Sequence, residues 1–498
     1  MNSIKKTIIE NKNSIRLYGG IIILAFLICG VFLRFHMTSD SYSWILNKFY
    51  FVDNALFSIG GRPISDFFLY YTEIINLNMI KYQTFYNFIS IIIMICSTIL
   101  LYKLILKLKI TSFSNKKFII LASFLIIFNV FGFEMFLYNV MFSLSIQYLL
   151  IIYSLKILLD KTDVKNIITA ILLNFLGLCV YQAIGSLFLP LGIILIGYKV
   201  REQKNIVIIK EYLKLVFIYG VACVLNLTII KMVAANRYDT AVSIYDNFIY
   251  MMNGQKTVWI NSFGVLPKYF FLGSIIILLL ISFIIILKNK KVKMLKMLSI
   301  LIFSIAALVF LSLAPLLLAK GWMVPRTCMI LSTIPGIILL FISLFGFNDE
   351  KNHQKVLEYI LAIILFIYIS FMLNAAYIMN NSLLLVNSID KSTTLKIEKI
   401  IKKYEKNNNV EITKVSFKND LSVGLTQANF RFPGMDAFAR AYATPWSRLG
   451  IMEYYMKRDF IEVEMSEGIY SQFKNMDWNE FDETQIIIKD NILNIMIY

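Results

Sequence analysis

Long apolar runs constrain this chain more than any other feature, because about 20 mostly apolar residues suffice to cross the hydrocarbon core of a bilayer. Nine such runs and one closely spaced shorter pair lie between residues 17 and 379. They cover 17–33, 85–106, 118–133, 136–158, 167–180, 184–200, 213–233, 269–287, 297–318, 327–347 and 356–379. We predict a polytopic α-helical membrane protein with about 11 transmembrane helices, or nine if the pair 167–180 and 184–200 forms a re-entrant hairpin.

Composition agrees with the membrane class. Hydrophobic residues make up 58% of the 498 residues and charged residues 16%, whereas soluble domains are roughly 45–50% apolar and about 25% charged. A net charge of +18 would suggest nucleic acid in a soluble protein. Here the basic residues cluster in short loops between apolar runs, and no nucleic-acid-binding motif is present, so we expect no nucleic-acid partner.

The loop charges predict an orientation, since Lys and Arg concentrate on the cytoplasmic side of a membrane. One set of loops is rich in Lys, including 103–117, 156–165, 199–210, 288–296 and 351–355. The opposite turns, at Glu134 and Gln182, contain none. We predict a multi-pass protein of the bacterial cytoplasmic membrane with its N-terminus in the cytoplasm. The run 17–33 is too long for a signal peptide, and an odd number of spans places the C-terminus outside.

The predicted domains are a transmembrane part, 1–379, and a tail, 380–498. The transmembrane part includes an outer loop, 34–82, whose many aromatic residues suit helices lying in the membrane interface. The tail has the pattern of a small α+β domain. Its expected elements are helices at 391–404, 436–442 and 448–457, a strand at 410–417, and a hairpin of 485–489 and 492–498 that turns at Asp490-Asn491.

The usual nucleotide, hydrolase and metalloprotease motifs are absent from the sequence. His36 and His353 fall on opposite sides of the predicted topology, and the five cysteines form no CxxC pair. We therefore predict no metal site, and the polar candidates are acids and arginines at the outer membrane surface.

Asp40 follows the first span by about seven residues, at a depth just above the lipid boundary. A carboxylate there suits a general base acting on a hydroxyl acceptor. The alternative is a helix N-cap before Tyr42, since Asp and Ser are preferred at that position.

Gly60-Gly61-Arg62-Pro63 lies in the same loop, with Asp66 close behind. Gly61 permits close backbone approach, and the fork-shaped guanidinium of Arg62 suits a pair of phosphate oxygens. The alternative is a turn before a helix that begins at Pro63.

Two further candidates lie in tight turns. Lys320 and Arg326 share a short outer loop at headgroup depth, where they either grip a lipid phosphate or simply snorkel to the interface. Glu134 sits between two spans with almost no loop, and a carboxylate so close to hydrocarbon usually has a partner or a task. We expect Arg62 or Lys320 as that partner, or headgroup water.

The order of these features resembles the serotype-converting O-antigen glucosyltransferases of the type II Gtr family, and more generally lipid-sugar glycosyltransferases of the GT-C fold. The resemblance rests on Asp40 in the first outer loop, on Gly61-Arg62-Pro63 before the second span, and on the later pair Pro325-Arg326. It implies a membrane glycosyltransferase that moves a sugar, typically glucose, from a polyprenyl-phosphate donor to a hydroxyl of a cell-surface glycan. Membrane lipid would surround the enzyme.

The resemblance also implies roles for the candidates. Asp40 would be the essential acid, Glu134 a second catalytic acid, and Gly61, Arg62, Asp66, Lys320 and Arg326 would bind substrate. Relatives often have two adjacent acids where this chain has Ser39-Asp40-Ser41. The resemblance therefore implies no certain cofactor and leaves a divalent cation possible. It also leaves open whether Asp53, Asp66 or Glu134 supplies the second acid.

Three other functions compete with this reading. A flippase or transporter of lipid-linked sugars would have charges in mid-span and repeat symmetry, whereas few such charges and no repeat are evident. A polysaccharide polymerase would have its large loop in mid-chain. A non-enzymatic scaffold, the third alternative, predicts no particular motif in the sequence. The sequence leaves open the sugar, the acceptor, the linkage and the oligomeric state.

Overall fold

The structure is a computed structural model that describes residues 2–46, 62–108, 113–138, 140–233, 243–289, 292–318, 323–346, 351–419, 435–473 and 481–497. The chain divides into two compact units. The helical unit comprises Met1–Leu33 and Asn54–Tyr377, and the tail unit comprises Arg34–Asp53 and Ile378–Tyr498. Each unit is described by itself.

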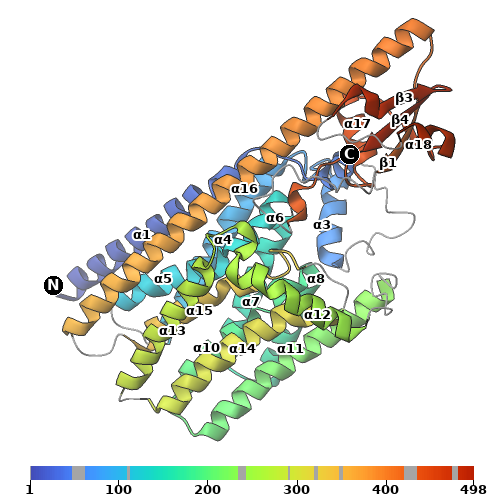
Figure 1. Ribbon diagram of the computed structural model, residues 1–498. Coiled ribbons are helices and arrows are strands. Elements are labelled where there is room, and N and C mark those ends of the chain that lie inside the picture. Colours follow the sequence, from blue (N-terminus) through green and yellow to red (C-terminus); the bar gives the residue numbers. More distant parts are fainter. Residues whose placement is uncertain are drawn as a thin grey trace. The chain divides into compact units, whose positions relative to one another are not determined.

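The helical unit is a set of helices joined by short connections (Figure 1). Its α-helices are α1 (Asn2–Cys29), α3 (Pro63–Ile74), α4 (Gln83–Leu106), α5 (Phe113–Ile127), α6 (Glu134–Leu137), α7 (Met141–Asp160), α8 (Val164–Val180), α9 (Gln182–Gly185), α10 (Phe188–Lys199), α11 (Asn205–Val233), α12 (Ile244–Gln255), α13 (Phe270–Lys288), α14 (Met294–Leu318) and α15 (Ile334–Phe345). The 3-10 helices η1 (Gly30–Leu33), η2 (Val130–Phe133), η4 (Ser262–Gly264) and η5 (Met329–Thr333) and the π-helix η3 (Lys256–Ile260) connect them.

The predicted polytopic helical membrane protein is confirmed at the level of its apolar helices. Within the described ranges, eight helices are long and apolar enough to cross a membrane, and a ninth span results if the bent pair Asn115–Ile127 and Val130–Leu137 is counted as one. Two further apolar helices, Val164–Val180 and Met329–Phe345, are shorter. The number eleven and the choice between two spans and a hairpin at 167–200 therefore stay predictions.

Polar side chains inside these helices tie neighbours together, as expected for spans in lipid. Asn174 on α8 donates to the hydroxyl of Ser154 on α7 at 2.8 Å, and Gln147 on α7 donates to the carbonyl of Tyr181 at 2.7 Å. Helix α15 packs against α5 and α13, and α10 packs against α14 and α11, which places fully buried helices at the centre of the unit.

Two shorter helices of this unit carry exposed aromatic faces. On α3, Phe67, Tyr70 and Tyr71 are each at least 42% exposed, while Ser65 and Thr72 are buried on the opposite side. On α12, the aromatic side chains of Tyr245, Phe248 and Tyr250 are likewise exposed. In a protein with many apolar helices, such faces suit the interface of a bilayer, as predicted for the loop 34–82.

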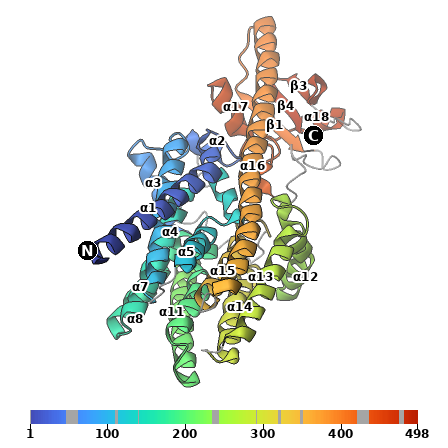
Figure 2. The ribbon, with the colours of Figure 1, turned by 90° about the vertical axis from the view of Figure 1, so that its left-hand side faces the viewer.

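The tail unit combines helices with a small sheet. Its C-terminal part, from α16 to β4, is drawn in orange to red in Figure 1. Its elements are α2 (Ser41–Ile45), the end of α16 (Lys351–Asn408), β1 (Lys414–Asn419), η6 (Asp436–Phe438), α17 (Arg448–Met456), β2 (Ile461–Glu462), α18 (Glu467–Phe473), η7 (Glu483–Gln485), β3 (Ile486–Lys489) and β4 (Ile492–Ile497). The strand order is β2-β1-β4-β3, with β1 parallel to both neighbours. Figure 2 shows α16 as one continuous helix of 58 residues.

The predicted hairpin is confirmed. Strands β3 and β4 pair antiparallel, with Lys489 opposite Ile492. Asp490 and Asn491 both have positive φ, 51° and 58°, which a two-residue type I′ turn requires and which Asn and Asp tolerate. The predicted strand at 410–417 begins four residues late, at Lys414.

The predicted helix at 436–442 is wrong beyond Phe438, where the described helical turn ends. The reason is tertiary: the backbone N–H of Ala441 donates to the carboxylate of Asp390 at 2.8 Å instead of continuing a helix. The side chain of Arg440 bonds the same carboxylate.

The first part of the loop 34–82 belongs to the tail unit rather than to the transmembrane part to which the sequence analysis assigned it. Tyr42 is buried against the rings of Tyr454 and Tyr455, at 5.9 and 6.1 Å between centroids. The backbone N–H of Met37 donates to the side chain of Asn387 on α16 at 2.8 Å. These contacts over several hundred residues are invisible in a local sequence pattern.

Candidate functional site

Three of the predicted site residues meet in the helical unit, together with two tyrosines. We call Arg62, Glu134, Tyr138, Tyr181 and Arg326 the arginine cluster. Each member lies where a helix begins, ends or is interrupted. Arg62 precedes α3, Glu134 begins α6, Tyr138 follows α6, Tyr181 lies between α8 and α9, and Arg326 precedes η5.

Glu134 and Arg326 form the centre of the arginine cluster. The carboxylate of Glu134, which has no exposed surface, accepts from the guanidinium Nη1 of Arg326 at 3.0 Å and from its backbone N–H at 2.8 Å. The same guanidinium donates to the hydroxyl of Tyr138 at 3.2 Å and lies 4.5 Å from the centre of that ring. A buried charge pair needs this degree of hydrogen bonding to offset its desolvation.

Tyr181 links both arginines. The guanidinium carbon of Arg62 lies 4.1 Å from the centre of the Tyr181 ring, a cation–π contact. The Tyr181 hydroxyl donates to the backbone carbonyl of Arg326 at 3.2 Å. The two guanidinium-bearing residues are therefore held on one aromatic side chain.

The position of Arg62 follows from how α3 is anchored. Arg62 precedes Pro63, which occupies the first helical position, where its missing N–H costs nothing. One turn on, the Ser65 hydroxyl donates to the carbonyl of Val180 at 2.9 Å, at the end of α8. Asp66 lies in the same first turn, and its backbone N–H donates to the Arg62 carbonyl.

Polar side chains stabilise the helix interruptions that carry the cluster. At the break before η2, the Asn129 side chain accepts from the N–H of Gly132 at 2.9 Å and from the Ser332 hydroxyl at 3.0 Å. A Cβ at Gly132 would lie 2.9 Å from that Asn129 oxygen, so glycine is required there. Non-helical backbone at membrane depth persists where protein satisfies it, as here.

Asp40 lies in the tail unit, beside a tryptophan. Its carboxylate accepts from the indole N–H of Trp446 at 2.7 Å. The Trp446 side chain is 39% exposed, so an aromatic surface and a carboxylate stand next to each other. Asp40 precedes α2 but makes no side-chain cap hydrogen bond there, which removes the capping alternative.

The structure thus unites Arg62, Glu134 and Arg326 and puts Asp66 in the turn after Arg62. The structure shows Arg326 as a partner of Glu134, which the sequence analysis did not name, and the expectation of Arg62 or Lys320 stays a prediction. Gly61 and Lys320 lie outside the described residues, as does Asp53.

Sequence reasoning missed Tyr138, Tyr181 and Trp446. Tyr181 had a usable signal, since it interrupts two apolar runs that are both short for a span. Tyr138 and Trp446 had none, because their partners lie 188 and 406 residues away.

A divalent cation would need several oxygen ligands close together. Among the residues that the structure describes, no three His, Cys, Asp or Glu side chains form such a group.

Neither a protein-family model nor a curated protein sequence matches this chain. The inference of function rests on the residues themselves and on the resemblance in layout.

Proposed function

We propose that the protein is a membrane glycosyltransferase that transfers a hexose, glucose in the simplest case, from a polyprenyl phosphate to a hydroxyl of a cell-surface glycan. The observation that carries this proposal is the arginine cluster. Two arginines lie together among apolar helices, one stacked on the Tyr181 ring and one bonded through its backbone carbonyl to the Tyr181 hydroxyl. This arrangement suits a phosphate at the membrane surface better than a purely structural role.

The chemistry is a single displacement with inversion. Asp40 accepts the proton of the acceptor hydroxyl, whose oxygen forms the new bond to the anomeric carbon. The bond between that carbon and the phosphate oxygen breaks, and its electron pair leaves with the polyprenyl phosphate. Arg62 and Arg326 stabilise the charge of this leaving group, so the leaving group needs no proton.

The geometry of Glu134 suits a positioning residue. Its carboxylate is enclosed and already accepts twice from Arg326, so it is ill placed to take a proton from substrate. We propose that it fixes the guanidinium of Arg326 for phosphate binding. Trp446, exposed beside Asp40, would offer its face to the apolar side of a sugar ring.

The proposal includes a topology. Eight spans, the bent pair and the two shorter apolar helices make eleven crossings, with the N-terminus in the cytoplasm and the tail unit outside. A reporter fused after Tyr498 that is active only outside the cytoplasm should be active, and its inactivity would contradict this orientation.

The direct test uses purified protein in lipid nanodiscs with radiolabelled polyprenyl-phosphate glucose and glycan extracted from a strain that lacks the protein. We expect Asp40→Asn to lower transfer by about 10³-fold while donor binding persists. Arg62→Gln should weaken donor binding about tenfold, in line with a lost charge-assisted contact. Both variants must insert normally, and full transfer by Asp40→Asn would refute the mechanism.

A flippase of lipid-linked saccharides is the second candidate. The interrupted helices α5–α6 and α8–α9 favour it, because discontinuous helices often hold substrate in transporters. Movement of polyprenyl-phosphate sugar across a liposome membrane, without sugar transfer to any acceptor, would favour the flippase. Transfer by protein in nanodiscs, where no compartment exists to flip into, would favour the enzyme.

A further inference from the structure

The part of α16 in the tail unit carries an unusual concentration of one charge. Six lysines lie on it, all exposed: Lys391, Lys396, Lys399, Lys402, Lys403 and Lys406. At 100° per residue they fall within an arc of about 140°. The opposite side holds Thr393, Ile397 and Ile401, which are buried in the tail unit. We call the arc the lysine face.

The lysine face is a local feature of the tail. Residues 378–498 contain 15 Lys and Arg against 16 Asp and Glu, so the segment as a whole is not basic. Within the described part of the chain, Lys402 is the one member of the face with an ion pair, to Glu398 at 2.6 Å. Two of the other five lysines, Lys391 and Lys396, lie 5.9 and 5.8 Å from the centres of the Tyr455 and Phe481 rings.

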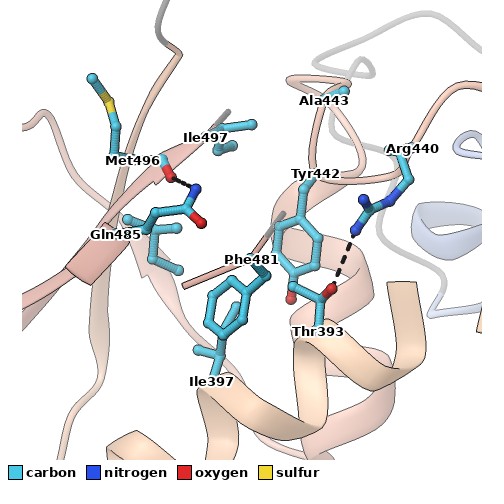
Figure 3. Close-up of a pocket in the computed structure, with 10 residues that line it drawn as sticks. Thr393, Ile397, Arg440, Tyr442, Ala443, Phe481, Gln485, Met496 and Ile497 are labelled. Atoms are coloured by element: carbon cyan, nitrogen blue, oxygen red, sulfur yellow. Dashed lines mark hydrogen bonds between the residues drawn. The ribbon is translucent and has the colours of Figure 1, made fainter. Parts of the chain in front are cut away.

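A pocket opens between α16 and the sheet of the tail unit (Figure 3). Its empty volume, mouth included, is about 390 Å³, and Phe481, Tyr442, Thr393, Ile397 and Arg440 are among its lining residues. Thr393 and Ile397 belong to α16, and the ammonium of Lys396 lies 5.8 Å from the centre of the Phe481 ring. Thr393 and Ile397 lie on the side of α16 opposite to the lysine face, so the pocket meets this face only at its edge, at Lys396.

We propose that the lysine face and this pocket together bind an anionic glycan, a saccharide polymer with phosphate or carboxylate groups. One sugar ring lies against the Phe481 ring at the mouth of the pocket, and the lysines follow the charged chain. Cations recur about once per helical turn, or every 5.4 Å or so, a spacing comparable with the length of a sugar unit. The proposal rests on the proposed function, for which it names the class of acceptor.

The length of α16 argues against lipid headgroups as the ligand. Counted along the helix from Met379, where the apolar run ends, Lys391 comes after about 18 Å and Lys406 after about 40 Å. A face that extends along the helix over this distance suits a soluble polymer, whereas surface electrostatics of a bilayer fade within about a Debye length.

The test measures binding of the full chain in nanodiscs of neutral lipid to fluorescent dextran phosphate, with unmodified dextran for comparison. We expect binding of the phosphorylated polymer alone, weakening steeply with salt, since counterions are released. The variant Lys399→Gln/Lys403→Gln/Lys406→Gln should lose at least tenfold in affinity. The matched control Lys414→Gln/Lys457→Gln/Lys489→Gln removes three exposed lysines elsewhere on the tail and should lose less than twofold.

Equal losses in the two triple variants would overturn the proposal, because binding would then reflect general charge. Loss of dextran phosphate binding when phosphatidylglycerol is added to the nanodisc would assign the lysine face to lipid headgroups instead. Phe481→Ala should weaken binding several-fold without changing the salt dependence, and no effect would remove the pocket from the site. Asp40→Asn should still bind dextran phosphate, so failure of the transferase mechanism and failure of this site are distinguishable.

Discussion

The helical unit and the tail unit each contain a buried carboxylate held by an arginine, and the two pairs differ in what surrounds them. In both, the carboxylate accepts from a guanidinium and from a backbone N–H. Asp390 receives the side chain of Arg440 and the amide of Ala441. Glu134 receives the side chain and the amide of Arg326 itself.

The surroundings suggest different purposes. Arg440 is 8% exposed and donates a further bond to Thr393 at 3.2 Å, so its pair fastens the loop of residues 440–443 onto α16 within the tail unit. The side chain of Arg326 is 14% exposed and lies over Tyr138. Its backbone carbonyl accepts from the hydroxyl of Tyr181, on whose ring a second arginine stacks. The tail pair stabilises a domain, whereas the helical pair, under the proposed function, prepares a charge for a ligand.

The largest expected effect comes from breaking the tail pair. Arg440→Leu leaves the Asp390 carboxylate buried without its guanidinium, which typically costs about 3–5 kcal/mol. We expect early loss of the tail unit in thermal unfolding, measured by protease cleavage between residues 378 and 498. The double variant Asp390→Asn/Arg440→Gln, which removes both charges, should recover most of this loss. Equal resistance of Arg440→Leu and the unmodified protein would contradict the structural role.

The helical pair should respond mainly in function. Glu134→Gln keeps an oxygen acceptor but releases the charge that fixes Arg326, and a displacement of about 1 Å at a site can cost roughly 10²-fold in rate. The apparent KM for the polyprenyl-phosphate donor should rise, while the unfolding midpoint moves little.

Arg326→Lys provides the comparison, because it keeps the positive charge but loses the fork that reaches both Glu134 and Tyr138. If Arg326→Lys retained normal donor KM while Glu134→Gln unfolded the protein, the helical pair would be structural like the tail pair.

A third, more exposed pair should show the smallest effect. Burial alone would raise the pKa of Glu405, but hydrogen bonds from Arg458 and from the amide of Ile412 outweigh it and hold the pKa below its ordinary value. A lowered folded-state pKa gives stability that is present above the unfolded-state pKa and is lost as the pH falls through the folded-state value. Below that value, the unmodified tail and Glu405→Gln should unfold at similar temperatures.

Above pH 5, Glu405→Gln should be less stable by no more than about 1 kcal/mol, seen as a small shift of the midpoint. Glu464→Gln, which changes an exposed acid of the same unit, serves as the control. A difference between Glu405→Gln and the unmodified protein that grows on acidification would contradict the assignment.

Sequence patterns predicted part of the candidate site. Arg62, Glu134 and Arg326 were identifiable because charges are rare at the ends of apolar runs, where each needs a physical reason. Which of them pair was not predictable, since 192 residues separate Glu134 from Arg326. Tyr138 and Tyr181 look like ordinary aromatic residues until the fold brings them to the guanidinium groups.

The sequence by itself determined the apolar helices, because the thickness of a bilayer fixes how many apolar residues a span requires. It also determined the turn at Asp490-Asn491, whose backbone conformation few other residues tolerate. The tertiary structure alone decided that residues 34–46 pack with the tail, that residues 439–442 leave the helical path, and that Glu134 binds Arg326. Local patterns record only the preferences of neighbouring residues, whereas these three outcomes depend on partners that only folding brings together.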